Sequence, residues 1–164
     1  MRRLLLAVLP VVLLTALAGP ANAGDEVQEV KVEGVGTPGP YGSGGCGDSA
    51  GAGSDYVIAM AGDLEGCIYG WVLEFEFNEE TGEYQELGRE LFVGSYGDRS
   101  GTFVLTEQFY AVFAADGSQL SGGCSHPIHE GSGTGDFANA RGKLTFVDDV
   151  NLGVANYQGE LKLM

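Results

Sequence analysis

Basic residues are scarce in this chain of 164 residues. Lys and Arg together number 8 against 23 Asp and Glu, and the formal net charge is −15 at pH 7. No cluster of basic residues occurs beyond the first three positions. A surface of this sign repels nucleic-acid phosphates and anionic lipid headgroups. The composition therefore excludes nucleic-acid binding, and it predicts an acidic protein that stays in solution.

Long apolar runs are also absent, except at the amino end. There, two arginines precede the apolar run 4–18, and Ala-Asn-Ala follows at 21–23. A basic start, a short apolar stretch and a small-x-small end are typical of a secretory signal peptide. A membrane span needs roughly 20 apolar residues, and Pro10 interrupts this shorter run. We therefore expect a signal peptide over 1–23, a secreted extracellular protein and no membrane span.

Helical periodicity is missing after Ala23, and alternation with a period of two takes its place. In the segment 71–77 the apolar residues Trp71, Leu73, Phe75 and Phe77 fall on one side. Such alternation predicts a strand with one face in water. The same pattern covers 101–113, 144–150 and 155–163, and weaker strand patterns cover 26–34, 55–63, 84–95 and 117–125.

The connections between these segments predict the fold class. They are short and rich in Gly, Asn and Asp, as tight hairpins require. About eight strands joined in this way form an antiparallel sandwich or a closed barrel. We favour an all-β, eight-stranded antiparallel barrel, because closure removes exposed strand edges. The barrel domain is expected over 55–164, after a glycine-rich segment over 24–54 that holds a possible first strand and lacks periodicity from 35 onwards.

Three cysteines, Cys46, Cys67 and Cys124, lie after the expected cleavage site. Export favours oxidation, so one disulfide and one remaining cysteine are expected, with three possible pairings. Cys46 lies in a loose glycine-rich segment, whereas Cys67 and Cys124 each lie beside a strand pattern. We therefore favour Cys67–Cys124, which leaves Cys46 free or available to another chain.

The stretch 123–146 contains two further patterns that carry chemistry. Gly133, Gly135 and Ala138 fit the dinucleotide-binding spacing Gly-x-Gly-x-x-Ala, but neither a buried strand before them nor a helix after them is predicted, and the pattern needs both. Cys124, His126 and His129 have metal-ligand spacing. A disulfide-bonded Cys124 cannot bind a metal, so no metal site and no cofactor are predicted, and His126 with His129 is kept as the alternative.

Two carboxylates are candidates for a catalytic role. In the alternating strand patterns, Glu107 falls on the same face as Phe103 and Phe109, and Asp148 falls on the same face as Phe146. Both carboxylates are therefore expected to face the apolar interior. Burial raises the pKa of a carboxyl group, which then acts as an acid or base, or anchors a ligand hydroxyl. The alternatives are a bulge or rim position that leaves Glu107 in water, an ion pair with Arg89, and a solvated turn around Asp148.

Aromatic side chains are expected to fill the barrel interior or to line a ligand cavity within it. A filled core is favoured for a small barrel. The candidates for the cavity wall are Trp71, Phe75, Phe103, Phe109 and Tyr157.

The segment GSGTGDFANARGKLTFVDD, followed by ANYQGEL, resembles the closing strands of allene oxide cyclase and dirigent-type barrels. In those families a Gly-x-Gly-x-Phe/Tyr turn, an Ala/Val-x-Gly step and a Tyr-x-Gly ending recur. The matching residues are Gly133, Gly135, Phe137, Ala140, Gly142, Tyr157 and Gly159. The resemblance covers roughly residues 60 to 163, and the middle segment ELFVGSYGDRSGTFVLTEQFYAVF looks like a secreted bacterial group of the same shape.

This resemblance implies an eight-stranded barrel with an axial cavity. In the cyclases such a cavity holds an oxidised fatty-acid epoxide, and in dirigent proteins it orients phenolic radicals or quinone methides. The functional residues of the cyclases lie on earlier strands and do not align with this chain, so none is carried over.

Three hypotheses of function follow. The first is a secreted barrel that binds a small apolar, aromatic or phenolic ligand, or acts as an extracellular scaffold, without turnover. The second is an isomerase, cyclase or stereochemical guide that uses Glu107, with Asp148 as a further candidate. The third is metal capture by His126 and His129. The oligomeric state is not encoded in any pattern of the sequence.

Overall fold

The computed structural model describes residues 27–164 and is almost entirely β-structure. Its strands are β1 (Gln28–Gly39), β2 (Tyr56–Gly62), β3 (Leu64–Asn78), β4 (Glu83–Tyr96), β5 (Arg99–Phe113), β6 (Gln119–Pro127), β7 (Thr134–Gly135), β8 (Arg141–Asp149) and β9 (Val154–Leu163). Two 3-10 turns, η1 (Ser43–Gly45) and η2 (Ser49–Gly51), follow β1. The expected signal peptide over 1–23 lies outside the described residues. Within residues 27–164, no helix has the length and apolar character needed to cross a membrane.

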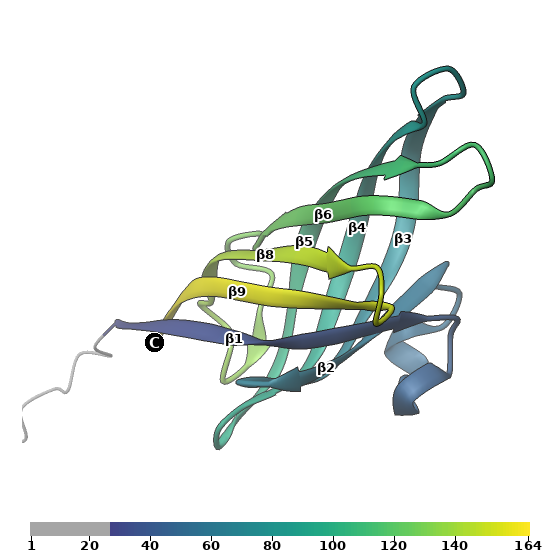
Figure 1. Ribbon diagram of the computed structural model, residues 1–164. Coiled ribbons are helices and arrows are strands. Elements are labelled where there is room, and N and C mark those ends of the chain that lie inside the picture. The colour runs from purple at the N-terminus through teal and green to yellow at the C-terminus, as the bar shows by residue number, and fades with distance from the viewer. Residues whose placement is uncertain (1–26) are drawn as a thin grey trace, which may run out of the picture.

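The strands close into the antiparallel barrel that the alternation predicts (Figure 1). Their order is β4-β3-β2-β1-β9-β8-β6-β5, and a further pairing between β4 and β5 joins the two ends. β7, two residues long, pairs only with the start of β5 at Gly101 and Thr102. The eight-stranded all-β barrel is therefore confirmed. Closure pairs both edges of each barrel strand, which is how a barrel avoids the aggregation to which open sheets are prone.

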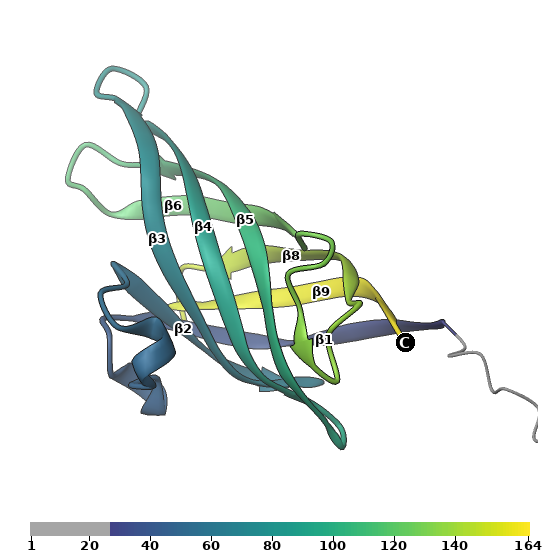
Figure 2. The same cartoon turned by 180° about the vertical axis from the view of Figure 1, so that it is seen from behind.

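β1 belongs to the barrel wall, although it precedes residue 55. It pairs with β9 from Gln28 to Gly36 and with β2 from Gly34 to Gly39. The strand thus continues through part of the segment for which the sequence predicts a loop. After Gly39 the chain forms η1 and η2, which lie on the outside of the barrel beside β2 (Figure 2).

One end of the barrel is filled by large apolar side chains. Phe92, Phe103 and Phe137 are fully buried there, with ring centroids 4.7 to 6.0 Å apart. The Tyr157 hydroxyl accepts a hydrogen bond from the Leu64 N–H at 2.8 Å and so links β9 to β3. Tightly interlocked aromatic rings thus fill the interior of the barrel at this end.

At the opposite end, which we call the open end, the β3–β4 and β5–β6 hairpins extend beyond the other strands (Figures 1 and 2). A bulge at Leu73 shifts the register of β3 against β4 between Val72 and Glu74. It places Trp71 on the outer face, whereas Phe75 shares the inner face with its pairing partner Glu86. The prediction that Trp71, Leu73 and Phe75 share one face is therefore wrong, since an extra residue reverses the alternation.

The disulfide joins Cys46 to Cys67, and the predicted Cys67–Cys124 pair is wrong. Cys67 lies on the outer face of β3, in a small cluster with Tyr69 and Val57. Cys124 lines the interior from β6 and is a free thiol. The wall of the barrel thus separates these two sulfur atoms, while the loop that carries Cys46 lies against the outer face, where Cys67 is accessible to it.

Candidate functional site

A pocket of about 460 Å³ lies at the open end of the barrel. Its size is within the range of small-molecule sites. Strands β1, β2, β4, β5, β6, β8 and β9 all contribute to its wall, as does the β8–β9 turn. The lining residues are Pro38, Tyr56, Ile58, Glu86, Glu107, Phe109, Ser118, Gln119, Cys124, Phe146, Asp148, Asp149, Val150, Gly153, Val154 and Ala155.

A layer of buried polar side chains lies between this pocket and the apolar core. The Tyr56 hydroxyl is 2.7 Å from Oε2 of Glu107 and 2.9 Å from Oε1 of Glu90. The other oxygen of Glu90, Oε2, lies 2.5 Å from Nδ1 of His126. Glu107 is 5% exposed, and Glu90 and His126 are fully buried. We call Tyr56, Glu90, Glu107 and His126 the polar floor.

The geometry of the polar floor favours a proton on one of its two carboxyl groups. Tyr56 has one hydroxyl proton for two carboxyl groups, and the shorter contact, at 2.7 Å, is the bond that it donates to Oε2 of Glu107. Two buried carboxylates that share a single donor repel one another, so one of them keeps a proton. We assign that proton to Glu107, because Glu90 already has the His126 ring beside it.

Electrostatics lead to the same assignment. Burial raises the pKa of Glu107 to about 9, and the nearby negative charge of Glu90 contributes to the shift. Burial, with the charges of Glu90 and Glu107, also raises the pKa of the Tyr56 hydroxyl. The pKa of the Cys124 thiol is raised by burial and by the same carboxylates. At neutral pH Cys124 is therefore a thiol and a poor nucleophile.

Two glycines make room for the polar floor. A Cβ atom at Gly70 would lie 2.0 Å from Cζ of Tyr56, and one at Gly88 would lie 2.5 Å from Oε2 of Glu107. Any other residue at these positions would collide with the two side chains that form the hydrogen bond. Gly70 and Gly88 are thus part of the site, although they contribute no side chain.

Two further carboxylates lie higher in the pocket wall. Asp148 accepts a hydrogen bond from the Gln119 side chain at 2.5 Å, and Glu86 accepts one from the Tyr84 hydroxyl. Oδ1 of Asp148 makes no hydrogen bond within residues 27–164, and the Glu86 carboxyl group lies within hydrogen-bonding reach of Glu107. The pocket therefore has an acidic wall above its polar floor.

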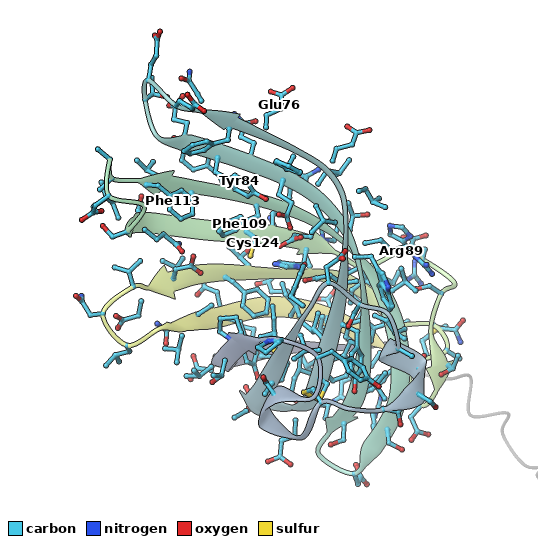
Figure 3. All side chains as sticks on the ribbon, turned by 90° about the vertical axis from the view of Figure 1, so that its right-hand side faces the viewer. Glu76, Tyr84, Arg89, Phe109, Phe113 and Cys124 are labelled. Carbon is cyan, nitrogen blue, oxygen red and sulfur yellow. A yellow bond between two sulfur atoms is a disulfide. The ribbon has the colours of Figure 1, made fainter. Side chains whose placement is uncertain are left out.

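Aromatic rings continue from the pocket onto the extended hairpins. Phe109 lines the pocket, and its ring centroid lies 6.0 Å from that of Tyr84. Tyr84 in turn contacts Phe75 and Phe113, at centroid distances of 6.0 and 6.1 Å. Figure 3 shows Tyr84, Phe113, Phe109 and Cys124 along the same side of β4, β5 and β6, with Arg89 away from them. We call Phe75, Phe77, Tyr84 and Phe113 the aromatic overhang.

The residues singled out from the sequence fall into two groups. Glu107, Asp148 and Phe109 line the pocket. Phe103 and Tyr157 are buried in the filled end, Trp71 packs on the outer face, and Phe75 is 65% exposed on the aromatic overhang. Those four do not line the pocket, so only Phe109 of the five expected wall residues does. The expected catalytic roles of Glu107 and Asp148 remain predictions.

Arg89 makes no ion pair with Glu107. It is paired with Trp71 and Thr106, whose side chains belong to the outer face. Of the alternatives for Glu107, both the ion pair with Arg89 and the rim position in water are thus contradicted, since Glu107 is 5% exposed.

The two histidines do not converge on a common point. His126 is buried in the polar floor, whereas His129 lies 2.5 Å from the Thr106 hydroxyl on the outer side of β5. The structure therefore does not bring these two rings together, because the barrel wall lies between them. No group of three or more His, Cys, Asp or Glu in the part of the chain from Val27 to Met164 has a metal-binding arrangement.

Sequence reasoning missed most of the polar floor. Tyr56 and Glu90 are not among the site residues that the sequence indicates, and His126 is indicated only as half of a metal pair. The hydrogen-bond partners in the polar floor are 34 to 51 residues apart in the chain. Alternation within 84–95 puts Glu90 on the same side as Phe92, a signal that could have identified it as a second buried carboxylate. The sequence around Tyr56 contains no pattern that indicates a site residue.

Comparison with known protein families finds one family whose model matches the chain. The model of a family described as "Protein of unknown function (DUF3224)" matches residues 55–160. The chain belongs to this family. The matched region begins at the start of β2 and ends within β9, so the DUF3224 region contains all four residues of the polar floor, while β1 precedes it. A search of curated proteins finds no match to the chain.

Proposed function

We propose that this DUF3224 barrel binds a small amphipathic molecule in the pocket, with an apolar or aromatic body against Phe109, Phe146 and Ile58. The observation that supports the proposal is the pocket of about 460 Å³ that ends on the Glu107–Tyr56 pair. Small-molecule sites combine an apolar wall with a few fixed polar groups in this way. The apolar wall supplies affinity through burial, and the polar floor orients the ligand.

The proposal is tested by dye uptake in two variants of the same residue. N-phenyl-1-naphthylamine is uncharged and fluoresces in apolar surroundings, so its emission reports an accessible pocket. Cys124→Phe places a large ring in the pocket, and Cys124→Ala removes the thiol without filling space. We expect uptake by the natural protein and by Cys124→Ala, and its loss in Cys124→Phe. Equal uptake by both variants, or none by the natural protein, contradicts the proposal.

A second candidate function is an isomerase or cyclase, of the kind that the allene oxide cyclase and dirigent resemblance implies. The specific observation in its favour is the buried Glu107 carboxyl group at the floor of the pocket, with Tyr56 and Glu90 behind it. A carboxyl group with a pKa of about 9 is a proton donor at neutral pH and could give its proton to a ligand oxygen and recover it later. No atom is gained or lost in such an isomerisation.

Turnover distinguishes this second function from binding alone. The probes are an oxidised fatty-acid epoxide and a quinone methide, whose rearrangement or addition products are separated by chiral chromatography. We expect Glu107→Gln to retain dye uptake and to lose product formation. If the product distribution equals that of the spontaneous reaction with the natural protein, the second function is rejected and the first is unaffected.

We also propose that the protein acts outside the cell. The Cys46–Cys67 disulfide supports this, because such bonds persist in oxidising compartments. Expression of the full chain in a host with an export pathway should give a secreted product that begins at Gly24. A product that stays in the cytosol with its first 23 residues attached contradicts this location.

A further inference from the structure

We propose that the ligand of the pocket is an organic cation, a protonated amine on an apolar or aromatic body, and that it binds in exchange for the proton of Glu107. The inference deepens the proposed function and rests on it. It concerns the chemical class of the ligand, which the pocket's own charges determine.

No Lys, Arg or His lines the pocket, whereas four carboxyl groups do. They belong to Glu86, Glu107, Asp148 and Asp149. None of the four forms a salt bridge with another residue of the stretch 27–164, where the salt bridges involve Glu29, Glu90 and Glu160. A ligand carboxylate or phosphate would therefore be repelled throughout the pocket, whereas a cation would be attracted from several sides.

Two of these carboxylates are placed to contact a ligand directly. Oδ1 of Asp148 is unused, because Gln119 occupies only Oδ2. Glu107 presents its carboxyl group from the floor, where Gly88 leaves it space. Asp149 differs from both, because its Oδ1 accepts the backbone N–H groups of the β8–β9 turn and so stabilises that turn.

The aromatic residues suit the same kind of ligand. Phe109 and Phe146 line the pocket beside these carboxylates, and Tyr84 continues the wall upward. The face of an aromatic ring attracts an ammonium group, more strongly where water is excluded. The ammonium group of such a ligand would contact carboxylates and ring faces. Its apolar body would pack against the aromatic wall.

The exchange follows from the charge balance of the polar floor. Glu107 is faced by Tyr56 from β2, Glu86 and Glu90 from β4, Cys124 and His126 from β6, and Asp148 from β8. The one group among these that can be positive is His126, and it is paired with Glu90.

Glu107 therefore stays neutral by keeping its proton while the pocket is empty of a cation. When an ammonium group arrives, the carboxylate form gains a partner, and the proton of Glu107 passes to solvent. One positive charge enters as another leaves, so the net charge of this buried layer is unchanged.

The test uses three ligands with the same naphthalene body and different heads. They are 2-naphthylmethylamine, 2-naphthalenemethanol and 2-naphthoate, which are positive, neutral and negative at pH 6 to 8. Displacement of N-phenyl-1-naphthylamine gives their affinities. We expect the amine to bind about tenfold or more tightly than the alcohol, and the naphthoate to bind more weakly than both.

Calorimetry of the amine in buffers with different ionisation enthalpies counts the protons released. About one proton per bound amine is expected at pH 7, and the affinity should rise with pH between 6 and 8, where the amine itself stays charged. Glu107→Gln should abolish the proton release, and Asp148→Asn should reduce the amine's preference over the alcohol. Glu76→Gln, at an exposed position of β3 that does not line the pocket, is the matched control and should change neither (Figure 3).

The outcomes separate this inference from the proposed function. If all three ligands bind equally, or naphthoate binds best, the pocket is a ligand site but not a cation site. If the amine binds best without proton release, the exchange with Glu107 is rejected. If no ligand displaces the dye and the dye itself does not bind, the proposed function fails as well. Because the ligand series uses the natural protein, a variant that fails to fold leaves the test intact.

Discussion

The ring of Tyr56 lies directly across Gly70, where a Cβ atom would stand 2.0 Å from Cζ of the tyrosine. Gly70→Ala must therefore push the Tyr56 ring away from the wall and out of reach of Glu107. Overpacking of this kind costs about 1–3 kcal/mol of the free energy of unfolding. We expect a lower midpoint in urea denaturation and weaker dye binding, since the floor of the pocket is rearranged.

Gly47→Ala is the matched control for that substitution. A Cβ atom at Gly47 would meet only the Cα of Gly42, at 3.9 Å. The control should leave stability and dye binding unchanged. An equal effect of the two substitutions would mean that Gly70 is not special, and that the contact with Tyr56 does not determine the shape of the pocket.

Tyr56→Phe separates the contribution of the hydroxyl from that of the ring. The substitution retains the packing against Gly70 and removes the single hydroxyl that Glu90 and Glu107 share. Buried groups that lose a hydrogen-bond partner cost about 1–3 kcal/mol, so the free energy of unfolding should fall by that amount. Tyr110→Phe, where the hydroxyl is at the surface and bonded weakly to Glu83, should change it little. Equal values for both variants would show that the polar floor is not held by Tyr56.

Stability should depend on pH through Glu107. Its pKa is about 9 in the folded chain, against the ordinary value of 4.5 that a glutamate carboxyl group has in the unfolded chain, so below about 4.5 the group is protonated in both states. Between these values the unfolded chain loses the proton while the folded chain keeps it. The contribution of Glu107 to stability therefore falls as pH rises through this window, by at most about 1.4 kcal/mol per pH unit.

Denaturation at pH 5, 6, 7 and 8 tests this dependence. The difference in unfolding free energy between Glu107→Gln and the natural protein should grow in favour of the variant as pH rises, because glutamine does not ionise. A difference that stays constant, or that shrinks with pH, means that Glu107 is ionised in the folded protein. In that case the proton assigned from the Tyr56 geometry is absent as well.

The fold was largely predictable because alternation is a local property of strands. The segments 101–113 and 84–95 lie within β5 and β4 almost to the residue. The failures have particular causes. Glycines at 36 and 39 predict a loop, yet they lie in β1, where a Cβ at Gly36 would lie 2.6 Å from Cγ2 of Ile58 and 3.2 Å from the Phe146 ring. Glycine there permits close packing of a ring against the wall, and composition alone does not distinguish this from a flexible segment.

The site was less predictable, because it depends on register. The alternation within β5 places Glu107 inside the barrel. The residues that face it are determined by the strand pairings, such as those of Gly88 with Glu107 and of Tyr56 with Gly70. Each of these pairings joins two consecutive strands, but the alternation within either strand does not fix the register between them, and a shift of one residue would turn each side chain to the other face. The bulge at Leu73 is an example, since it moves Phe75 to the inner face and leaves Trp71 on the outer one.

The disulfide has consequences that the predicted pairing would not have. Cys46 and Cys67 are 21 residues apart, and closing a loop of this size stabilises a protein by about 3 kcal/mol in the chain-entropy model. Cys46→Ala should therefore lower the free energy of unfolding by about that amount. Cys124→Ala should leave the bond intact, because Cys124 lines the pocket as a free thiol.

Thiol titration gives an independent measure of the same connectivity. One thiol per chain should react in denaturant, and that thiol should react slowly in the folded protein, because burial raises the pKa of Cys124. Peptide mapping after alkylation should find the label on Cys124 and a peptide that joins Cys46 to Cys67. A label on Cys46 instead would place Cys67 and Cys124 on the same side of the wall. The registers of β3 and β6 would then be wrong, and so would the inward direction of Cys124 and His126 on which the pocket and its polar floor depend.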